Sequence, residues 1–279
     1  MGTPIGRRER DADPAAEFAE NGFLVIPDAL SGEQVCALNL AFDRYLKDYP
    51  EEWARFSESF IQTVNVLPRV PDFDVTIEHP RMLGLLRQLL GDELTFEEFS
   101  MMIRNPAAQT SELKGWHRDI TRSYERRMEI QAISVVYYLT DVTATDHCFS
   151  IVPGTHGRLV DLRPEDVEPG AEVDVVGPAG TALVFHARCI HAGKLKAGSR
   201  QRRTLHLYYG RRGQARTSEW SEIPARLHEK HDPALPPFLY SKWNVTDIYD
   251  GTGRKPQGAD PSLSTAELLM EAQRRANRR

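Results

Sequence analysis

The segment Trp116-His117-Arg118-Asp119 carries residue types that could do chemistry. Residues two apart on an extended strand point to the same side, so His117 and Asp119 would direct an imidazole and a carboxylate into one cavity. They could supply two of the three ligands of a facial triad, in which two histidines and one carboxylate hold Fe(II). The His-x-Asp pattern is short and also arises by chance, so it needs further support.

A second histidine and an arginine follow later in the chain. The segment from Thr181 to His186 reads as a strand, His191 follows it, and Arg202 stands eleven residues after His191. Fe(II) held by two histidines and one aspartate keeps three open positions, which suit a bidentate 2-oxo acid and dioxygen. An arginine suits the far end of such an acid, because its planar guanidinium pairs with a carboxylate through two parallel hydrogen bonds.

His186 competes with His191 for the place of the third ligand. His186 lies on the predicted strand itself, and the eleventh residue after it is Ala197 rather than an arginine. The spacing therefore favours His191.

Arg203 competes in the same way with Arg202. Alternation along a strand places Arg202 on the face of Thr204 and His206, and it places Arg203 on the opposite, apolar face. The pattern therefore favours Arg202.

The elements that must position these residues change in character along the chain. Residues 14–93 read as mostly helical, with helices at Pro14–Asn21, after Ser31 and at Pro80–Leu90, and with a brief strand from Phe23. Residues 94–210 contain short segments of branched and aromatic residues separated by Gly, Pro and Asp, which are typical of a β-sandwich or barrel. We expect one domain over residues 1–279, with a flexible stretch at 1–13 and an extension at 211–279.

The composition narrows the classes of partner. The formal net charge is -5 and the pI is near 6, which argues against a nucleic-acid partner. The longest apolar run, Ile133–Leu139, is too short to cross a bilayer. Three widely spaced cysteines, Cys36, Cys148 and Cys189, favour a reducing compartment. We expect a cytoplasmic monomer or homodimer that acts on a small molecule without a membrane or nucleic acid.

Several motifs together resemble the phytanoyl-CoA dioxygenase family of Fe(II)- and 2-oxoglutarate-dependent oxygenases. The motifs are Asn21-Gly-Phe-Leu-Val-Ile-Pro, Gly115-Trp-His-Arg-Asp, Cys148-Phe-Ser-Ile-Val-Pro-Gly-Thr-His, Ala182-Leu-Val-Phe-His, and His191-Ala-Gly with Arg202. The resemblance covers about residues 16–210. It implies a mainly β fold with flanking helices and a double-stranded β-helix core of the jelly-roll or cupin type.

The resemblance also implies roles for single residues. His117, Asp119 and His191 would bind Fe(II), and Arg202 would hold the distal carboxylate of 2-oxoglutarate, with O2 as the other co-substrate. The implied reaction is oxidation, most simply hydroxylation, of an unactivated C–H bond in a small organic molecule, for example in natural-product biosynthesis. Arg104, on a strand before the first motif, could reach 2-oxoglutarate or an acidic substrate.

Other residues could line the mouth of the pocket. The loop after the first motif offers basic and aromatic side chains, and His206 shares the face of Arg202, so the candidates for substrate contact are Arg122, Tyr124, Arg126 and His206. The chain also departs from the family pattern. Thr145-Asp146-His147 replaces a common Asn-Gly, and Gly193 stands where a serine is common, so a contact to 2-oxoglutarate would differ here.

Two other functions stay open on the sequence alone. A jelly-roll metalloenzyme could use another divalent metal for non-oxidative chemistry, and such an enzyme would need neither Arg202 nor 2-oxoglutarate. A binding domain of the same fold could also lack turnover, although the intact ligand set opposes this reading.

Overall fold

We describe the protein from a computed structural model, which describes residues 13–107, 115–119, 132–157, 167–168, 170–197, 199–214, 221–241, 267 and 270. Its helices are α1 (Pro14–Asn21), α2 (Gly32–Asp48), α3 (Asp74–Ile77), α4 (Pro80–Leu90) and α5 (Ala225–His228). Its strands are β1 (Phe23–Ile26), β2 (Ala54–Ser57), β3 (Phe60–Thr63), β4 (Leu94–Arg104), β5 (Ile133–Tyr138), β6 (Cys148–Ile151), β7 (Val173–Val175), β8 (Ala182–His186), β9 (His191–Lys194) and β10 (Arg202–Arg211).

The helix ends follow from local capping. The Asp13 side chain accepts a hydrogen bond from the backbone of α1, and Gly22 ends that helix at a φ of 78°, in the left-handed region that favours glycine. Ser31 and Gln34 form a reciprocal capping box at the start of α2. Helix α1 therefore begins and ends where the sequence predicts, and α2 begins where it predicts.

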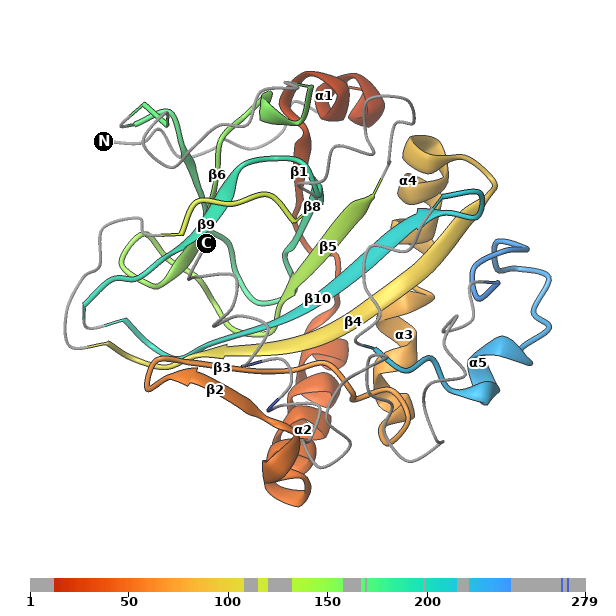
Figure 1. Cartoon of the computed structure of the whole chain (residues 1–279), viewed down its shortest axis with the longest axis horizontal. Coiled ribbons are helices and arrows are strands. Elements are labelled where there is room, and N and C mark those ends of the chain that lie inside the picture. The colour runs from red at the N-terminus through yellow and green to blue at the C-terminus, as the bar shows by residue number, and fades with distance from the viewer. Residues whose placement is uncertain are drawn as a thin grey trace.

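Seven strands form the main sheet in the order β1-β8-β5-β10-β4-β3-β2, and every pair in it is antiparallel. Figure 1 shows the long strands β4 and β10 running side by side across the molecule. A smaller antiparallel sheet has the order β7-β6-β9. Two antiparallel sheets of this kind agree with the jelly-roll core that the resemblance implies.

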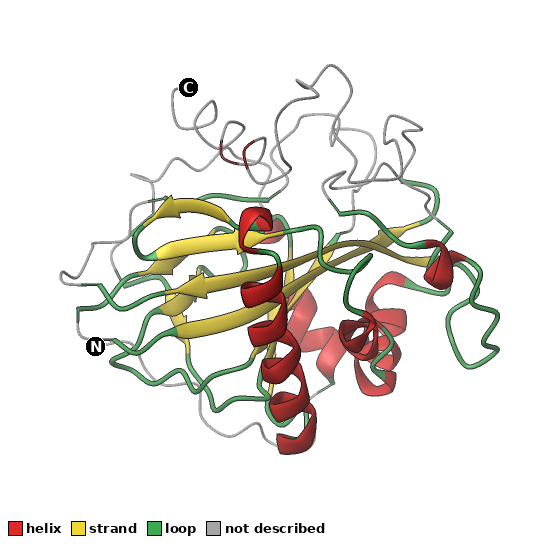
Figure 2. Ribbon diagram, turned by 90° about the horizontal axis from the view of Figure 1, so that it is seen from below, coloured by secondary structure: helices red, strands yellow, loops and turns green. Residues whose placement is uncertain are grey.

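The two faces of the main sheet have different partners. Leu205, Leu207 and Tyr209 of β10 pack in one apolar core with Leu38 and Phe42 of α2. Figure 2 shows the helices gathered on this side of the strands. The opposite face turns toward the small sheet, and a second apolar cluster, including residues of β5, β6, β7 and β8, fills part of that interior. The inward face of β10 therefore lines the space between the two sheets.

Four strands were not anticipated from the sequence. Residues 14–93 contain β2 and β3 besides the helices, so this part is less helical than predicted. Both strands have four residues, too few for a clear periodic signal; β2 is the edge strand of the main sheet and β3 lies next to it. The strands β7 and β9 have three and four residues, which is too short for a periodic signal. The sequence also predicts a final helix from about Ser264, and this segment lies almost wholly outside the described residues.

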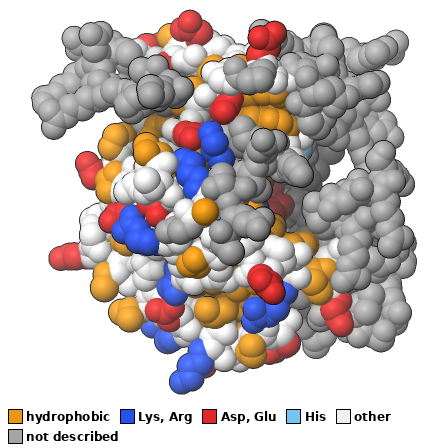
Figure 3. Space-filling view, turned by 90° about the vertical axis from the view of Figure 1, so that its left-hand side faces the viewer, with side chains coloured by type: hydrophobic (Ala, Val, Ile, Leu, Met, Phe, Trp, Pro, Cys, Tyr) orange, Lys and Arg blue, Asp and Glu red, His pale blue; other side chains and the backbone are white. Residues whose placement is uncertain are grey.

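The surface carries both charge signs. On the face drawn in Figure 3, basic and acidic side chains of the described residues lie interspersed among hydrophobic ones. None of the helices in the described ranges combines the length and the apolar character that crossing a membrane requires.

Candidate metal centre

The short segment 115–119 is attached to the start of β9. The backbone N–H of His117 donates to the carbonyl of His191, and the N–H of His191 donates back, both at 3.0 Å. The backbone N–H of Asp119 donates to Ala187 at 2.9 Å. The sequence predicts a strand here, but the structure has only an isolated bridge. The backbone pairing still brings two distant segments together.

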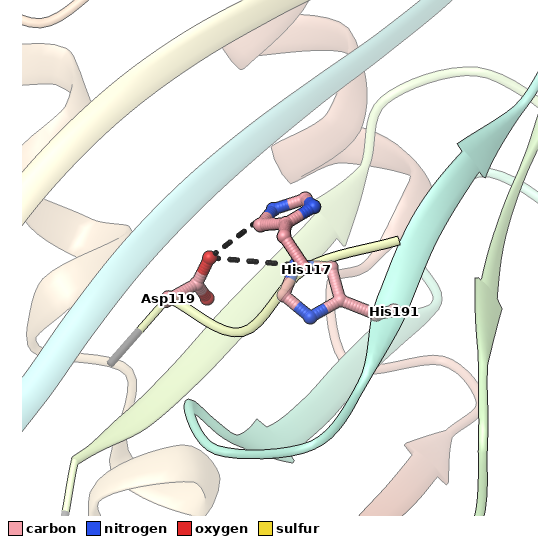
Figure 4. Close-up of side chains that lie close together, drawn as sticks. All are labelled: His117, Asp119 and His191. Atoms are coloured by element: carbon pink, nitrogen blue, oxygen red, sulfur yellow. Dashed lines mark ion pairs between the residues drawn. The ribbon is translucent and has the colours of Figure 1, made fainter. Parts of the chain in front are cut away.

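Three potential metal ligands converge at this bridge. The ligand atoms of His117, Asp119 and His191 all lie within 4.8 Å of one another. Asp119 Oδ1 lies 3.5 Å from His117 Nε2 and 3.4 Å from His191 Nε2, and Figure 4 shows both contacts. Among the described residues, this is the one group of three or more histidine, cysteine or carboxylate side chains that lie close enough together to bind the same metal ion.

The backbone orients both imidazole rings. His117 Nδ1 lies 2.8 Å from the carbonyl of Gly115, and His191 Nδ1 lies 3.0 Å from the carbonyl of Cys189. A carbonyl can only accept, so each Nδ1 donates a proton to its carbonyl, and each Nε2 is left as the ring atom that can bind a metal. The hydrogen bond at the other ring nitrogen thus fixes which nitrogen of each ring faces Asp119.

Burial and charge act in opposite directions on the aspartate. Burial raises the pKa of the Asp119 carboxyl, but the nearby imidazoles of His191 and His117 outweigh this effect and hold the pKa below its ordinary value. The side chain of His191 is only 5% exposed, while that of His117 is 54% exposed. The cluster is therefore buried on the side of His191 and more exposed on the side of His117, and the Asp119 carboxylate carries a negative charge.

Apolar rings enclose the buried histidine. The Phe149 ring stacks on His191 with centroids 4.8 Å apart, and the Phe185 ring meets it edge-on at 4.9 Å. These contacts leave His191 little rotamer freedom, so the position of its Nε2 is fixed by packing.

Tyr208 completes the surroundings of the carboxylate, and the sequence analysis missed it. Its hydroxyl donates to Asp119 Oδ2 at 2.9 Å, which leaves Oδ1 facing the two histidines. Tyr208 lies on the inward face of β10 with Arg202, Thr204 and His206, since the register pairs Thr204, His206 and Tyr208 with inward residues of β5. The same alternation that favoured Arg202 could have identified it.

Arg202 is a buried cation whose partners are missing among the described residues. The residue is 5% exposed, and its Nε and Nη1 atoms are buried without a hydrogen-bond partner in the ranges that the structure describes. Burial lowers the pKa of this guanidinium. An unpaired buried charge is costly, so the site is suited to an anion that comes from outside the protein.

Arg104 lies directly across the sheet from Arg202. The two residues are register partners of β4 and β10. The Arg104 guanidinium stacks over the Phe60 ring at 3.6 Å. Burial, and then the charge of Arg202, lower its pKa to about 9. The structure thus places a second cation beside the first one.

His206 lies between these charges and the three ligands. Its Nε2 and the Thr204 hydroxyl are 3.0 Å apart. Burial, followed by the charge of Arg202, lowers the pKa of His206 to about 3, although Asp119 acts in the opposite direction. The imidazole is therefore neutral, and it lies between Arg202 and Tyr208 on the inward face of β10.

His186 and Arg203, the alternatives to His191 and Arg202, both point away from the triad. His186 accepts a hydrogen bond from the backbone of Arg188 at 3.1 Å, and its ring faces His156 at 5.6 Å rather than Asp119. Arg203 points to the helix side of the sheet and pairs with Asp43 at 2.7 Å.

Three of the predicted substrate residues, Arg122, Tyr124 and Arg126, lie outside the described residues. The motif departure at Asp146 has a structural role. Its carboxylate accepts hydrogen bonds from Thr143 and from Arg200, just before β10.

Comparison with known families identifies the chain. The family model described as phytanoyl-CoA dioxygenase matches residues 18–204, which span the triad and Arg202. The chain belongs to the phytanoyl-CoA dioxygenase family. The L-proline trans-4-hydroxylase of Streptomyces griseoviridis is 24% identical over 268 residues, covering 82% of this chain and 92% of that protein. The ectoine dioxygenase of Bordetella bronchiseptica is 24% identical over 71% of this chain and 74% of its own length.

Solved structures support the fold. HygX from Streptomyces hygroscopicus, with nickel, 2-oxoglutarate and hygromycin B bound, superposes with a TM-score of 0.59 at 18% identity, covering 80% of this chain and 93% of that one. The epimerase SnoN, in complex with Fe3+, alpha ketoglutarate and nogalamycin RO, gives a TM-score of 0.57 at 22% identity, covering 71% of this chain and 82% of that one. These likenesses show the jelly-roll fold of this chain.

Family and site agree on the class of enzyme. The protein is an iron- and 2-oxoglutarate-dependent dioxygenase. Two imidazole Nε2 atoms and one carboxylate are the donor set of a non-haem Fe(II) site, and the Arg202 guanidinium, unpaired within the described ranges, fits a carboxylate ligand.

Proposed function

We propose that this dioxygenase hydroxylates an unactivated C–H bond of a small organic molecule, such as an intermediate of natural-product biosynthesis. His117, Asp119 and His191 hold Fe(II), and Arg202 holds the distal carboxylate of 2-oxoglutarate. Bound iron supplies the activation of O2, which is coupled to the decarboxylation of 2-oxoglutarate to succinate and CO2. One oxygen atom enters the substrate in this reaction.

The observation that carries this proposal is the buried Arg202, which is unpaired within the described ranges and lies on the strand that also contacts the triad. Arg202 lies on the inward face of β10, and Tyr208 on the same face donates a hydrogen bond to Asp119. A metalloenzyme of non-oxidative chemistry would not need this cation to hold 2-oxoglutarate. The named activities of the relatives, which include hydroxylation of L-proline, support hydroxylation here.

The protein's own residues define the geometry of the reaction. The backbone carbonyls of Gly115 and Cys189 fix the two histidine rings, and Tyr208 fixes the carboxylate, so the three donors are ready before a metal binds. Phe149 and Phe185 exclude water from the side of His191. The exposed edge of His117 leaves the opposite side of the centre open to substrate.

A substrate screen tests the proposal. The Fe(II)-loaded protein is supplied with 2-oxoglutarate and O2, and with single members of a panel of amino acids, acyl thioesters and natural-product scaffolds. If the protein hydroxylates its substrate, the molar amount of succinate released should equal the molar amount of product, and the mass of the product should exceed that of the substrate by one oxygen atom. Product formation that needs a metal but neither O2 nor 2-oxoglutarate would favour non-oxidative chemistry, and binding without turnover would favour a binding domain.

A further inference from the structure

Two arginines stand side by side on the inward face of the main sheet. Arg202 begins β10 and Arg104 ends β4, and the antiparallel register pairs them directly. Directly opposed residues point to the same face with their Cβ atoms ~5 Å apart, and like charges in such a pair destabilise the sheet. This arrangement needs a negative charge nearby.

None of the described residues supplies that charge. Arg202 forms no ion pair in the described ranges, and two of its buried nitrogen atoms lack hydrogen-bond partners there. Arg104 likewise has no ion pair or hydrogen bond in that part of the chain, where its guanidinium contacts the Phe60 ring. Arg203, one residue along the same strand, shows the contrast because it pairs with Asp43 at 2.7 Å. The two inward arginines are therefore left for a ligand.

The Arg104 side chain reaches across the interior to the small sheet. A Cβ atom added to Gly193 would lie 3.4 Å from Arg104 Nη2, so the guanidinium lies over the place where residue 193 would carry a side chain. Gly193 follows the metal ligand His191 by two residues on β9. Residues two apart on a strand share a face and are separated by ~7 Å, about the length of a five-carbon diacid.

We propose that Arg104 and Arg202 together bind the distal carboxylate of 2-oxoglutarate, and that Gly193 leaves the room that Arg104 needs. This inference rests on the proposed function. One carboxylate accepts hydrogen bonds from both guanidinium groups, and its negative charge relieves the repulsion between them. The pair makes the distal carboxylate a requirement, so the site selects a diacid over a 2-oxo acid with one carboxylate.

The lowered pKa of Arg104 supports a ligand at this place. Burial and the neighbouring Arg202 lower it to about 9, and a carboxylate bound between the two groups would raise it again. An anionic group of the substrate is the other ligand that Arg104 could take, and the experiment separates the two.

The test compares two 2-oxo acids that differ only at the far end. The dissociation constants of 2-oxoglutarate and of 2-oxopentanoate, which has a methyl group in place of the distal carboxylate, are measured by calorimetry on Fe(II)-loaded protein without O2. We expect Arg104→Gln to weaken 2-oxoglutarate binding by about tenfold or more and to leave 2-oxopentanoate binding unchanged, since only the diacid loses a charge-assisted pair. Arg104→Lys, which keeps the charge, should recover part of the affinity.

Arg203→Gln serves as the matched control, because Arg203 lies on the other face of the same strand. Thermal melts check that each variant is folded. Equal 2-oxoglutarate affinity in Arg104→Gln and wild type would overturn the inference and would assign Arg104 to the substrate. A weakening of both acids by the same factor would also overturn it. Failure of the wild type to bind 2-oxoglutarate would instead contradict the proposed function itself.

Discussion

The hydroxyl of Tyr208 donates a hydrogen bond to Oδ2 of Asp119 at 2.9 Å, while Oδ1 of the same carboxylate faces the two histidines. One carboxylate oxygen thus accepts a hydrogen bond from Tyr208, and the other is left to face the histidine Nε2 atoms. Burial raises the pKa of the Tyr208 phenol well above its ordinary value, so the group stays a donor. Strand β10 therefore connects the metal end of the cavity with Arg202 at the other end.

This contact predicts a role for Tyr208 as a positioning residue. Tyr208→Phe removes the hydroxyl and keeps the ring, and loss of an outer hydrogen bond to a metal ligand costs roughly 10–100-fold in metal affinity or activity. We expect Fe(II) affinity, measured by anaerobic titration, to fall by about tenfold. The control is Tyr209→Phe, whose hydroxyl donates to Ile77 on the helix side. Equal Fe(II) affinity of both variants would contradict the positioning role.

The choice of the third ligand can be tested with the two competing histidines. His191→Ala should lose bound iron and all turnover, because it removes one of the three donors that lie within 4.8 Å of one another. His186→Ala should keep its iron, since His186 faces His156. Iron content and thermal melts are measured on both variants. Iron retained in His191→Ala but lost in His186→Ala would reverse the assignment.

The two adjacent arginines offer a matched pair for the co-substrate. Arg202→Ala should raise the 2-oxoglutarate concentration needed for half-maximal succinate formation by more than about tenfold, because a buried charge-assisted pair is worth roughly 2–5 kcal/mol. Arg203→Ala should leave that concentration nearly unchanged. This variant should instead have a lower free energy of unfolding, because it loses the ion pair with Asp43 and the stacking of the Arg203 guanidinium over the Phe42 ring at 5.0 Å. The opposite ranking would mean that the strand faces are assigned backwards.

Asp146 predicts a pH dependence of stability in the turn before β10. The hydrogen bond from Arg200, followed in effect by those from Thr143, lowers the pKa of this carboxyl, although burial acts in the opposite direction. A carboxyl with a folded-state pKa below its unfolded value of ~3.9 stabilises the protein above that pH, and this stability is lost as the pH falls through the folded-state pKa.

Asp146→Asn tests this dependence in metal-free protein. Urea unfolding at neutral pH should show a lower free energy of unfolding for the variant than for wild type. The difference in the free energy of unfolding between wild type and variant should narrow once the pH falls below ~4, where the Asp146 carboxyl of the unfolded wild-type chain begins to take up protons while that of the folded chain stays ionised. A difference in the free energy of unfolding between wild type and Asp146→Asn that stays constant from neutral to acidic pH would show that the charge of Asp146 does not contribute to stability.

Local signals in the sequence predicted a large part of the fold. Helices Pro14–Asn21 and Pro80–Leu90 have the predicted bounds, because a proline starts each and a glycine ends each. Strand β10 was predicted by its alternation of polar and apolar residues. Strand β9 was not, because its four residues are too few for a periodic signal.

The site was predictable to the extent that chemistry follows residue type. His117, Asp119 and His191 were found from their types and spacing, and the structure brings them together. The approach of the Arg104 guanidinium to the place where residue 193 would carry a Cβ atom could not be foreseen, since it joins strands of two different sheets. Tyr208 could have been found, because it shares the inward face of β10 with Arg202.

The most direct test of the account is anaerobic addition of Fe(II) and 2-oxoglutarate to the metal-free protein, followed by visible absorption. Chelation of triad-bound iron by the 2-oxo acid predicts a weak charge-transfer band in wild type. We expect the band to be absent in His191→Ala and to need a higher 2-oxoglutarate concentration in Arg202→Ala. A wild-type protein that binds iron but gives no band at saturating 2-oxoglutarate, or a band of full intensity in His191→Ala, would contradict the account.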